Sequence, residues 1–238
     1  MGKDRILKIG CCGFPVGRKR YYEHFNCVEI QQTFYHPPRI ETLKRWKEEA
    51  PDGFEFTLKA WQLITHTPKS PTYRRLKMEI PEKDAHLYGN FIPSDEVFSA
   101  WELTMDAARA LDAKIVVFQS PSSFKPSSQN LKNMREFFSQ LDRSDIQLAW
   151  EPRGWPEDMI LEVCKELDLI HVVDPFKGKG LWGKIRYFRL HGKGGYRYRY
   201  SEEDLLYLKE RVITGEGSFY VMFNNIYMFD DAKRFKGL

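Results

Sequence analysis

The sequence has few cysteines and none of the spacings that make cysteine a reliable marker of chemistry. Its four cysteines, Cys11, Cys12, Cys27 and Cys164, form no CxxC pair, which argues against a zinc knuckle or a redox dithiol. We therefore expect free thiols, as in proteins of the reducing cytoplasm.

Long apolar runs are also missing. The longest apolar stretches have the length of a strand, well short of the roughly 20 residues that span a bilayer. The first residues, MGKDRILKIGCCG, lack the apolar segment of a secretory signal, and the sixth residue is not the Ser or Thr of a myristoylation signal. These absences predict a cytoplasmic protein with no membrane association.

Several catalytic and cofactor motifs are absent as well. The sequence has no GxxxxGK[ST] phosphate loop, no GxGxxG dinucleotide fingerprint and no GxSxG nucleophile elbow. Its six histidines show no HxH or HxxE spacing, which disfavours a tightly held metal. We predict neither a cofactor nor a resident metal ion.

What the sequence does contain is a succession of eight short β-like runs, most of them separated by helix-period segments. That alternation is typical of a (β/α)8 or TIM barrel, in which ligand-binding residues sit at the C-terminal ends of the strands. The 238 residues suit a single domain of this kind. The predicted strands are 7–12, 27–33, 54–60, 114–119, 146–151, 169–174, 185–191 and 219–224.

Two connections between the predicted strands are unusual. Residues 61–97 form a long, proline-rich connection, which we expect to hold short helices and to cover one side of the barrel mouth. Residues 175–184 are too few and too rich in glycine for a full helix, so the sixth helix is expected to be short or missing. Further helices are predicted at 19–25, 38–50, 72–78, 82–88, 97–111, 129–141, 157–167 and after Ser201.

The positive charge is concentrated in one stretch. The net charge is +4, but residues 175–200 contain eight Lys or Arg and no Asp or Glu, which leaves 29 basic against 33 acidic residues elsewhere. A localised basic stretch indicates an anionic partner.

Carboxylates and a histidine at the predicted strand ends are the catalytic candidates. Glu29, Glu151 and Asp174 each lie in or directly after an apolar run, where a carboxylate is costly unless it is paired or functional. Because histidine titrates near neutrality, His191 is the best single acid–base candidate. We predict these four residues as catalytic; the alternative is a structural ion-pair network that lines the barrel.

Cationic and amide side chains near the same strand ends predict an anion site. The turn 192–195, Gly-Lys-Gly-Gly, follows the seventh strand, where barrels often bind phosphate, and glycine lets neighbouring N–H groups converge on an anion. An ordinary flexible loop is the alternative. The predicted substrate-binding residues are Lys59, His66, Arg153, Arg189, Gly192, Lys193, Gly194, Tyr35, Gln119, Asn224 and Asn225.

A second kind of partner is suggested by residues 196–200, Tyr-Arg-Tyr-Arg-Tyr. Alternating aromatic and basic side chains can stack on bases and neutralise phosphates, which makes Arg197, Tyr198 and Arg199 candidate nucleic-acid contacts. The same alternation also describes an extended edge with Tyr packed inward and Arg outward.

The strand-end motifs together resemble the YecE-like proteins, known as domain of unknown function 72. The similarity implies a TIM barrel but no settled activity. Cys12 and Gln31 differ from the Ser and Asn that are usual in the family. The motifs are GCCGF at 10–14, VEIQQTFY at 28–35, FEFTLK at 54–59, ITH at 64–66, FQ at 118–119, PSSF at 121–124, EPR at 151–153 with Trp155, Asp174, YFRLHG at 187–192 and FNN at 223–225.

Three functional hypotheses follow from these patterns. The first is an enzyme that binds a small phosphate- or carboxylate-bearing molecule at the C-terminal mouth and uses general acid–base catalysis, as a hydrolase or isomerase. The second is a nucleic-acid-binding or nuclease-like barrel, with a metal as one variant. The third is a barrel that binds a ligand without catalysis.

Overall fold

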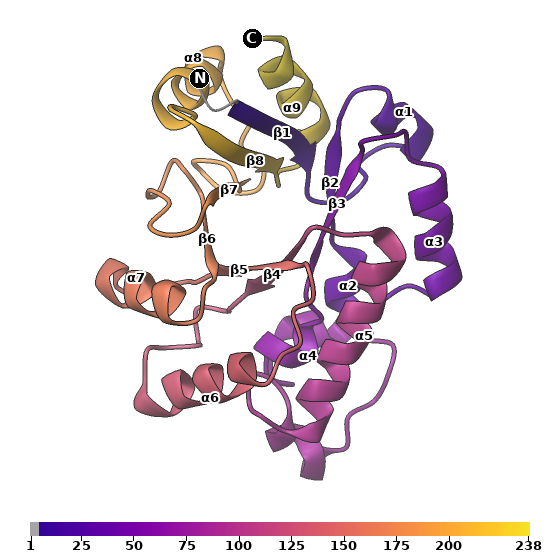
Figure 1. The fold of residues 1–238 in the computed structure, drawn as a ribbon, viewed down its shortest axis with the longest axis vertical. Helices are drawn as coiled ribbons and strands as arrows, with labels where there is room; N and C mark the ends of the chain where they lie inside the picture. Colours follow the sequence, from indigo (N-terminus) through magenta and orange to yellow (C-terminus); the bar gives the residue numbers. More distant parts are fainter. Residues whose placement is uncertain (1–4) are drawn as a thin grey trace.

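Eight parallel strands form the centre of the computed structural model, which describes residues 5–238 (Figure 1). Their order is β1-β8-β7-β6-β5-β4-β3-β2, and a parallel bridge between Cys12 and Glu29 brings the first and last of these together. The predicted (β/α)8 barrel is therefore confirmed. The strands are β1 (Arg5–Cys11), β2 (Cys27–Ile30), β3 (Glu55–Lys59), β4 (Ile115–Gln119), β5 (Gln147–Glu151), β6 (Ile170–Val173), β7 (Ile185–Leu190) and β8 (Gly217–Phe223).

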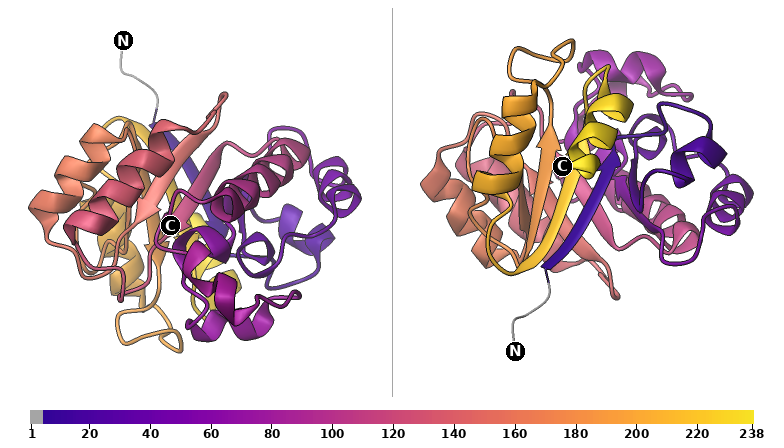
Figure 2. Two further views of the ribbon diagram at one scale, coloured as in Figure 1. Left: turned by 90° about the horizontal axis from the view of Figure 1, so that it is seen from below. Right: turned by 90° about the horizontal axis from the view of Figure 1, so that it is seen from above.

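Helices surround the ring of strands on its outside, as both views of Figure 2 show. None of the helices in residues 5–238 is both long and apolar enough to cross a membrane. The helices are α1 (Arg18–Tyr22), α2 (Gln32–Tyr35), α3 (Ile40–Glu48), α4 (Gln62–Thr65), α5 (Asp95–Leu111), α6 (Ser128–Ser139), α7 (Glu157–Glu166), α8 (Glu202–Tyr207) and α9 (Met228–Gly237), with the 3₁₀ segments η1 (Pro71–Arg75) and η2 (Glu82–Leu87) and the π-helical turn η3 (Leu208–Val212).

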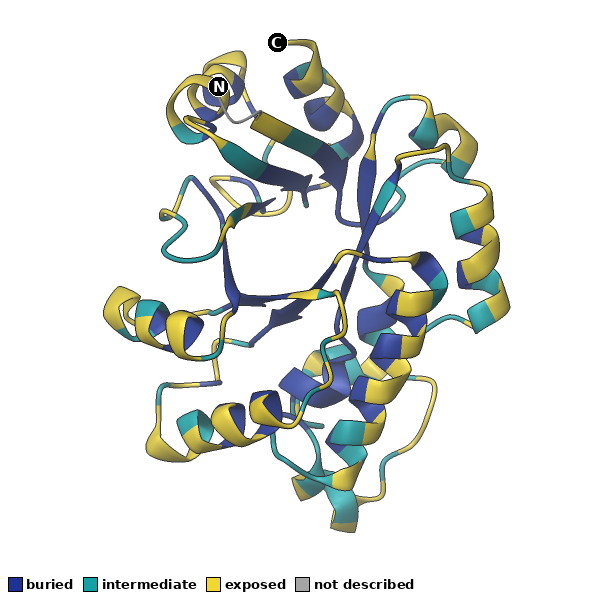
Figure 3. Cartoon of the chain, viewed as in Figure 1, coloured by how far each residue is buried: buried dark blue, intermediate teal, exposed yellow. Residues whose placement is uncertain are grey.

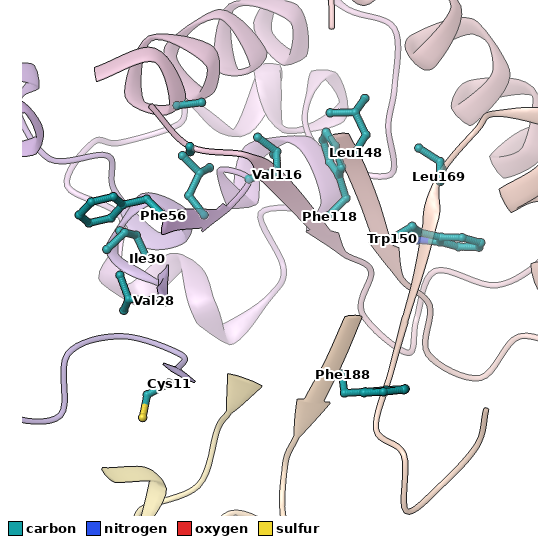
Figure 4. Packing of buried hydrophobic residues seen from close by; sticks show 14 of the residues in the cluster. Cys11, Val28, Ile30, Phe56, Val116, Phe118, Leu148, Trp150, Leu169 and Phe188 are labelled. Atoms are coloured by element: carbon teal, nitrogen blue, oxygen red, sulfur yellow. The ribbon is translucent and has the colours of Figure 1, made fainter. Parts of the chain in front are cut away.

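Two apolar layers stabilise the barrel, because neighbouring residues of a strand point to opposite faces. The outer layer packs the strands against the helices; Figure 4 shows Val116, Phe118 and Leu148 pointing that way. The inner layer fills the barrel and includes Tyr187 and Tyr220, whose rings stack with centroids 5.5 Å apart. In Figure 3 the strands are accordingly buried over most of their length, apart from the first residues of strands such as β1, while the helices expose their outer faces.

The connection from β6 to β7 contains no helix, as predicted. All of residues 174–184 are described, and they form turns and irregular loop. A groove of about 540 Å³ lies between this helix-free connection and the outer face of β7 and β8. We call it the outer groove; among its lining residues are Lys179, Arg186, Phe188, Tyr207, Arg211 and Phe219.

Some boundaries differ from the prediction. The second strand ends at Ile30 instead of residue 33, because the chain turns at once into α2. Thr33 therefore lies in a helical turn, where its hydroxyl donates to the backbone oxygen of Lys59 at 2.7 Å. The short α4 and the C-terminal α9 were not predicted.

The seam between β1 and β2 is joined largely by side chains. The Tyr21 hydroxyl accepts a hydrogen bond from the Cys11 N–H at 2.7 Å and donates one to the Cys27 oxygen at 2.9 Å. A Cβ on Gly10 would stand only 2.3 Å from that same oxygen, so glycine is required there. Close approach and a bridging hydroxyl thus bring the two strands together at the seam.

Candidate functional site

A buried arginine occupies the centre of the barrel near the C-terminal ends of the strands. The Arg189 side chain is 1% exposed, and its guanidinium lies between Glu29, at 3.0 Å, and Glu151, which also accepts a hydrogen bond from it. Gln119 accepts a further hydrogen bond at 3.3 Å. Glu29 is completely buried and also accepts from the Tyr187 hydroxyl at 2.8 Å.

This network changes the interpretation of two predicted residues. Arg189 was expected to bind the substrate anion, but its charge is already matched by two protein carboxylates. Glu29 was expected to be catalytic, but both of its oxygens are engaged inside the barrel. The alternative of a structural ion-pair network therefore describes this part of the site.

The second oxygen of Glu151 holds the predicted acid–base histidine. His191 Nε2 lies 3.0 Å from Glu151 Oε1, and His191 Nδ1 lies 3.1 Å from the side-chain nitrogen of Asn224. An amide nitrogen can only donate, so these contacts together favour a proton on Nε2 and a lone pair on Nδ1. Nδ1 is then the atom that can accept a proton.

Glu151 remains ionised at neutral pH. Burial acts to raise the pKa of Glu151, but the charge of Arg189 and the hydrogen bond from His191 outweigh burial and hold the pKa well below its ordinary value. A carboxylate of this kind orients a histidine and stabilises its protonated form. We therefore assign Glu151 to orientation of His191 and not to proton donation.

Asp174 connects the ends of two strands. One of its oxygens accepts from the His191 N–H and the other from the Phe176 N–H, each at 3.1 Å. Its carboxylate thereby holds the loop after β6 against the end of β7. The structure places this predicted catalytic residue as a support for the backbone of His191.

These strand ends open into a cavity of about 600 Å³, which we call the mouth cavity. Arg153 lines it, with its side chain 44% exposed and 3.5 Å from Glu151. Two exposed lysines of the loop after β6, Lys177 and Lys179, also line it. The remaining walls include Trp155, Glu157, Ile160, His171, Asp174, His191, Gly195, Tyr196 and Asn224.

Lys59 ends β3 on the inward face of the barrel and is 6% exposed. Its Nζ lies 3.5 Å from the centre of the Phe34 ring, and among residues 5–238 it has no ion-pair or hydrogen-bond partner. Burial, reinforced by Arg189, lowers the pKa of Lys59 to about 7. The ring face of Phe34 favours the charged ammonium, so this contact opposes the effect of burial.

His66 lies next to Lys59 and stays neutral. Its ring meets the Phe34 ring edge to face at 5.0 Å, and Nδ1 is 2.7 Å from the Thr65 hydroxyl. Burial, with Lys59 and Arg153 nearby, lowers the pKa of His66 to about 3. A neutral ring would meet a substrate by hydrogen bonding and not as the predicted cation.

The turn after β7, predicted to cradle a phosphate, makes several hydrogen bonds within the protein. The Gly192 N–H donates to the Tyr200 hydroxyl at 2.8 Å, and the Gly195 N–H donates to the Gly192 oxygen. Lys193 Nζ binds Asp204 at 2.8 Å. These three donors thus have partners within the protein, and anion binding at this turn stays a prediction.

Two more predicted binding residues serve the fold. Asn225 is fully buried, and its side-chain nitrogen donates to the Tyr198 oxygen and to Asp231. Tyr35 packs its ring under the Arg75 guanidinium, 3.6 Å away, and its backbone oxygen accepts from Gln62 at 3.0 Å.

The aromatic–basic run after this turn is irregular loop and not an extended edge. Tyr200 is buried and Tyr198 donates to Asp204 at 2.6 Å, whereas Tyr196 is 58% exposed and lines the mouth cavity. Arg197 and Arg199 are exposed. The basic side chains therefore face solvent beside the mouth.

Within residues 5–238 no group of three or more His, Cys, Asp or Glu side chains is arranged to hold a metal ion. Our expectation that the protein holds no metal or cofactor stays a prediction.

Four residues that line the mouth cavity were not predicted as site residues from the sequence: Lys177, Lys179, His171 and Tyr196. Lys177 and Lys179 follow Asp174 within the helix-free connection, and this position directly after a strand end was the available signal. His171 faces the cavity from within β6, where its Nδ1 accepts from the Leu181 N–H at 3.2 Å. Nothing in its spacing distinguishes it from a core histidine.

A parallel eight-stranded barrel with charged side chains at its strand ends defines the class of this protein as a TIM barrel. The family model described as "Protein of unknown function DUF72" matches residues 17–236, and the chain belongs to this family. It is 24% identical over 216 residues to the UPF0759 protein YunF of Bacillus subtilis strain 168, covering 78% of this chain and 71% of YunF. A shorter match to the UPF0759 protein YecE of Escherichia coli K12 is 42% identical over 48 residues, 20% of this chain and 18% of YecE.

Solved structures share the fold over nearly the whole chain. A DUF72 family protein (EF0366) from Enterococcus faecalis V583 superposes with a TM-score of 0.73 at 18% identity, covering 99% of this chain and 98% of that one. D-allulose 3-epimerase from Methylomonas sp. has a TM-score of 0.57 at 12% identity, covering 100% and 98%. Endonuclease IV from Thermus thermophilus has a TM-score of 0.54 at 8% identity, covering 99% of each chain.

Proposed function

We propose that this protein is an enzyme of the hydrolase or isomerase type that binds a small phosphate- or carboxylate-bearing molecule in the mouth cavity. The observation that carries the proposal is the pairing of His191 with Glu151 in a cavity that also receives three cationic side chains. An acid–base group and anion-binding groups thus face one space, as catalysis on a bound anion requires.

The cations supply the attraction for an anion. Lys177 and Lys179 are exposed and form no ion pair among residues 5–238. Arg153 has only a 3.5 Å contact with Glu151, which is already bound by Arg189. Positive charge therefore remains uncompensated at the cavity wall and favours phosphate or carboxylate.

His191 would move the proton. With Nε2–H donated to Glu151, the lone pair of Nδ1 accepts a substrate proton, and the ionised Glu151 stabilises the resulting imidazolium. The Asn224 amide, 3.1 Å from Nδ1, lies where it can position the reacting group or exchange its hydrogen bond with the substrate. Hydrolysis or isomerisation by general acid–base catalysis follows from this arrangement.

Anion binding is tested by titrating the protein with inorganic phosphate and following the backbone amides by NMR. We expect shifts around the mouth cavity, and at least a tenfold loss of affinity in the double variant Lys177→Ala, Lys179→Ala. Lys193→Ala is the matched control, because that ammonium is bound by Asp204. Equal affinity in all three proteins would contradict the proposed site.

Catalysis is tested by screening phosphorylated and carboxylated metabolites for turnover, and then measuring His191→Asn with the active compound. Loss of a general acid–base group lowers kcat by a factor of about 10² to 10⁴. Turnover unchanged in His191→Asn would remove the proposed mechanism. Tight binding without turnover of any compound would favour a non-catalytic ligand-binding barrel.

A second candidate function is binding of single-stranded nucleic acid. It is favoured by Tyr196 at the cavity wall, the exposed Arg197 and Arg199, and the outer groove, which shares Lys179 with the mouth cavity. Arg186 and Arg211 extend the positive charge along this groove. Fluorescence anisotropy with an oligonucleotide should then give an affinity that falls steeply with salt, and Arg197→Ala with Arg199→Ala should reduce that slope.

A further inference from the structure

Inside the barrel, at the level of the C-terminal strand ends, two cations and two carboxylates share one layer, but both carboxylates bind the same cation. Lys59 and Arg189 both point into this layer, together with the carboxylates of Glu29 and Glu151. Both carboxylates bind Arg189, which leaves Lys59 without an anionic partner among residues 5–238. The Lys59 amine thus lies at the C-terminal end of a strand without a paired carboxylate.

The contacts of the Lys59 amine are aromatic, with the charged groups Arg189, Glu151 and Glu29 farther away. Phe34 lies against Nζ at 3.5 Å, and His66 packs on the other edge of Phe34. Nζ has no hydrogen-bond partner within residues 5–238, although it is not completely enclosed. Lys59 keeps 6% of its surface exposed, and this is where a small molecule would have to approach.

We propose that Lys59 is a nucleophilic amine that forms a Schiff base with the carbonyl group of an anionic substrate. This inference rests on the proposed function, because it assumes the same small anion in the mouth, and it adds that the anion carries an aldehyde or ketone. A lysine that is desolvated and next to another cation is activated in this way.

The charged groups around Lys59 support an uncharged amine at neutral pH. Burial and the cations Arg189 and Arg153 lower the pKa of Lys59 to about 7, against the opposing effect of Glu151 and Glu29. The unprotonated fraction at pH 7 is then larger than the roughly one part in a thousand or less of an ordinary lysine.

The step is balanced without any oxidant or reductant. The lone pair of Nζ attacks the carbonyl carbon to form a carbinolamine, in which the oxygen takes up a proton. Loss of that oxygen as water gives the imine C=N bond, and a proton on nitrogen makes it an iminium. The iminium withdraws electrons from the neighbouring carbon, whose proton the Nδ1 of His191 would accept.

The test is reductive trapping with glyoxylate, a small anion that bears an aldehyde, and sodium cyanoborohydride as the reductant. The wild-type protein is labelled at pH 7, and each lysine is quantified by peptide mass spectrometry. We expect Lys59 to be labelled at least ten times faster than Lys179, which lies at the rim of the same mouth but is exposed. Lys59→Arg should lose this label while Lys179 is labelled as before.

Two further measurements distinguish a failure of the Schiff base at Lys59 from a failure of the proposed anion site. Inorganic phosphate should slow the labelling of Lys59 by glyoxylate but not by the uncharged aldehyde propanal, because only glyoxylate shares the anion site. If the protein binds phosphate but Lys59 is not labelled preferentially, the Schiff-base inference is wrong and the proposed anion site is unaffected. Preferential labelling by both aldehydes without any effect of phosphate would support the nucleophilic amine and overturn the anionic substrate.

Discussion

At the scale of single residues, the site depends on how one carboxylate is shared. Glu151 gives one oxygen to Arg189 and the other to His191. The first contact stabilises a buried charge that would otherwise be very costly, and the second orients the acid–base histidine. Stability and function are therefore coupled at Glu151.

Glu151→Gln should lower stability at pH 7 and have less effect in acid. Because the pKa of Glu151 is lower in the folded protein, its ionised form adds stability above the unfolded pKa of roughly 4.3, and this contribution is lost as the pH falls through the folded pKa. Breaking the buried pair should cost about 3 kcal/mol at pH 7. Urea unfolding at pH 7 and pH 3.5 measures both values.

Glu157→Gln is the control for this experiment, since Glu157 is an exposed carboxylate of the same cavity. Its unfolding free energy should match that of the wild type closely at either pH. A Glu151→Gln protein that loses the same stability at pH 7 and pH 3.5 would show that the ionised carboxylate is not the stabilising species.

At the scale of the elements, the strand ends were predictable and the partners of their side chains were not. Apolar runs that stop at a polar residue correctly located Lys59 and Glu151 at strand ends and His191 directly after one, because a strand is read from local pattern. Which carboxylate would bind Arg189 depends on side chains 38 and 160 residues away along the chain. Such pairings depend on barrel geometry, and no local pattern encodes them.

The turn after β7 illustrates the same limit. Its glycines suggested a phosphate cradle, yet a tight turn explains them: Gly192 has φ +86°, and a Cβ there would stand 2.2 Å from the Gly195 oxygen. Glycine in a sequence indicates a special backbone position. That position can be needed for binding a ligand or for forming a tight turn, and the sequence does not distinguish the two. The missing sixth helix, by contrast, was predictable from the length of its connection alone.

Gly192→Ala should therefore destabilise the protein by about 2 kcal/mol or more, because it adds an unfavourable φ to a steric overlap with the backbone. Gly194→Ala is the matched control in the same turn, where the new Cβ would meet only the Tyr198 ring at 3.7 Å. Thermal unfolding of both variants measures the difference. A loss of stability in Gly194→Ala as large as in Gly192→Ala would contradict this account of the turn.

At the scale of the whole molecule, the barrel is closed by different means on its two sides. From β8 through to β2 the strands are joined by regular parallel pairing, whereas β1 meets β2 at an isolated bridge. Closure matters for the site, since Glu29 on β2 and Arg189 on β7 approach each other across the barrel interior. A seam that opened would separate these charges and expose them to water.

Tyr21→Phe tests how much the seam depends on one hydroxyl. Burial raises the pKa of Tyr21, so the hydroxyl keeps its proton and serves both strands at once. Without it the Cys11 N–H and the Cys27 oxygen lose their partner, at a cost of about 2 to 4 kcal/mol. Hydrogen exchange should show faster exchange at Cys11 and its neighbours in β1, with little change in β4 and β5.

Tyr22→Phe provides the comparison, because its less buried hydroxyl donates to the Trp46 oxygen at 3.0 Å and bridges no strands. It should cost about 1 kcal/mol or less and leave exchange at the seam unchanged. If Tyr21→Phe behaved like Tyr22→Phe, closure of the barrel would rest on packing at Gly10 and not on the bridging hydroxyl. A larger loss of stability in Tyr21→Phe would instead show that closure of the barrel depends on this hydroxyl. Its partner Cys11 is next to Cys12, which forms the bridge to Glu29.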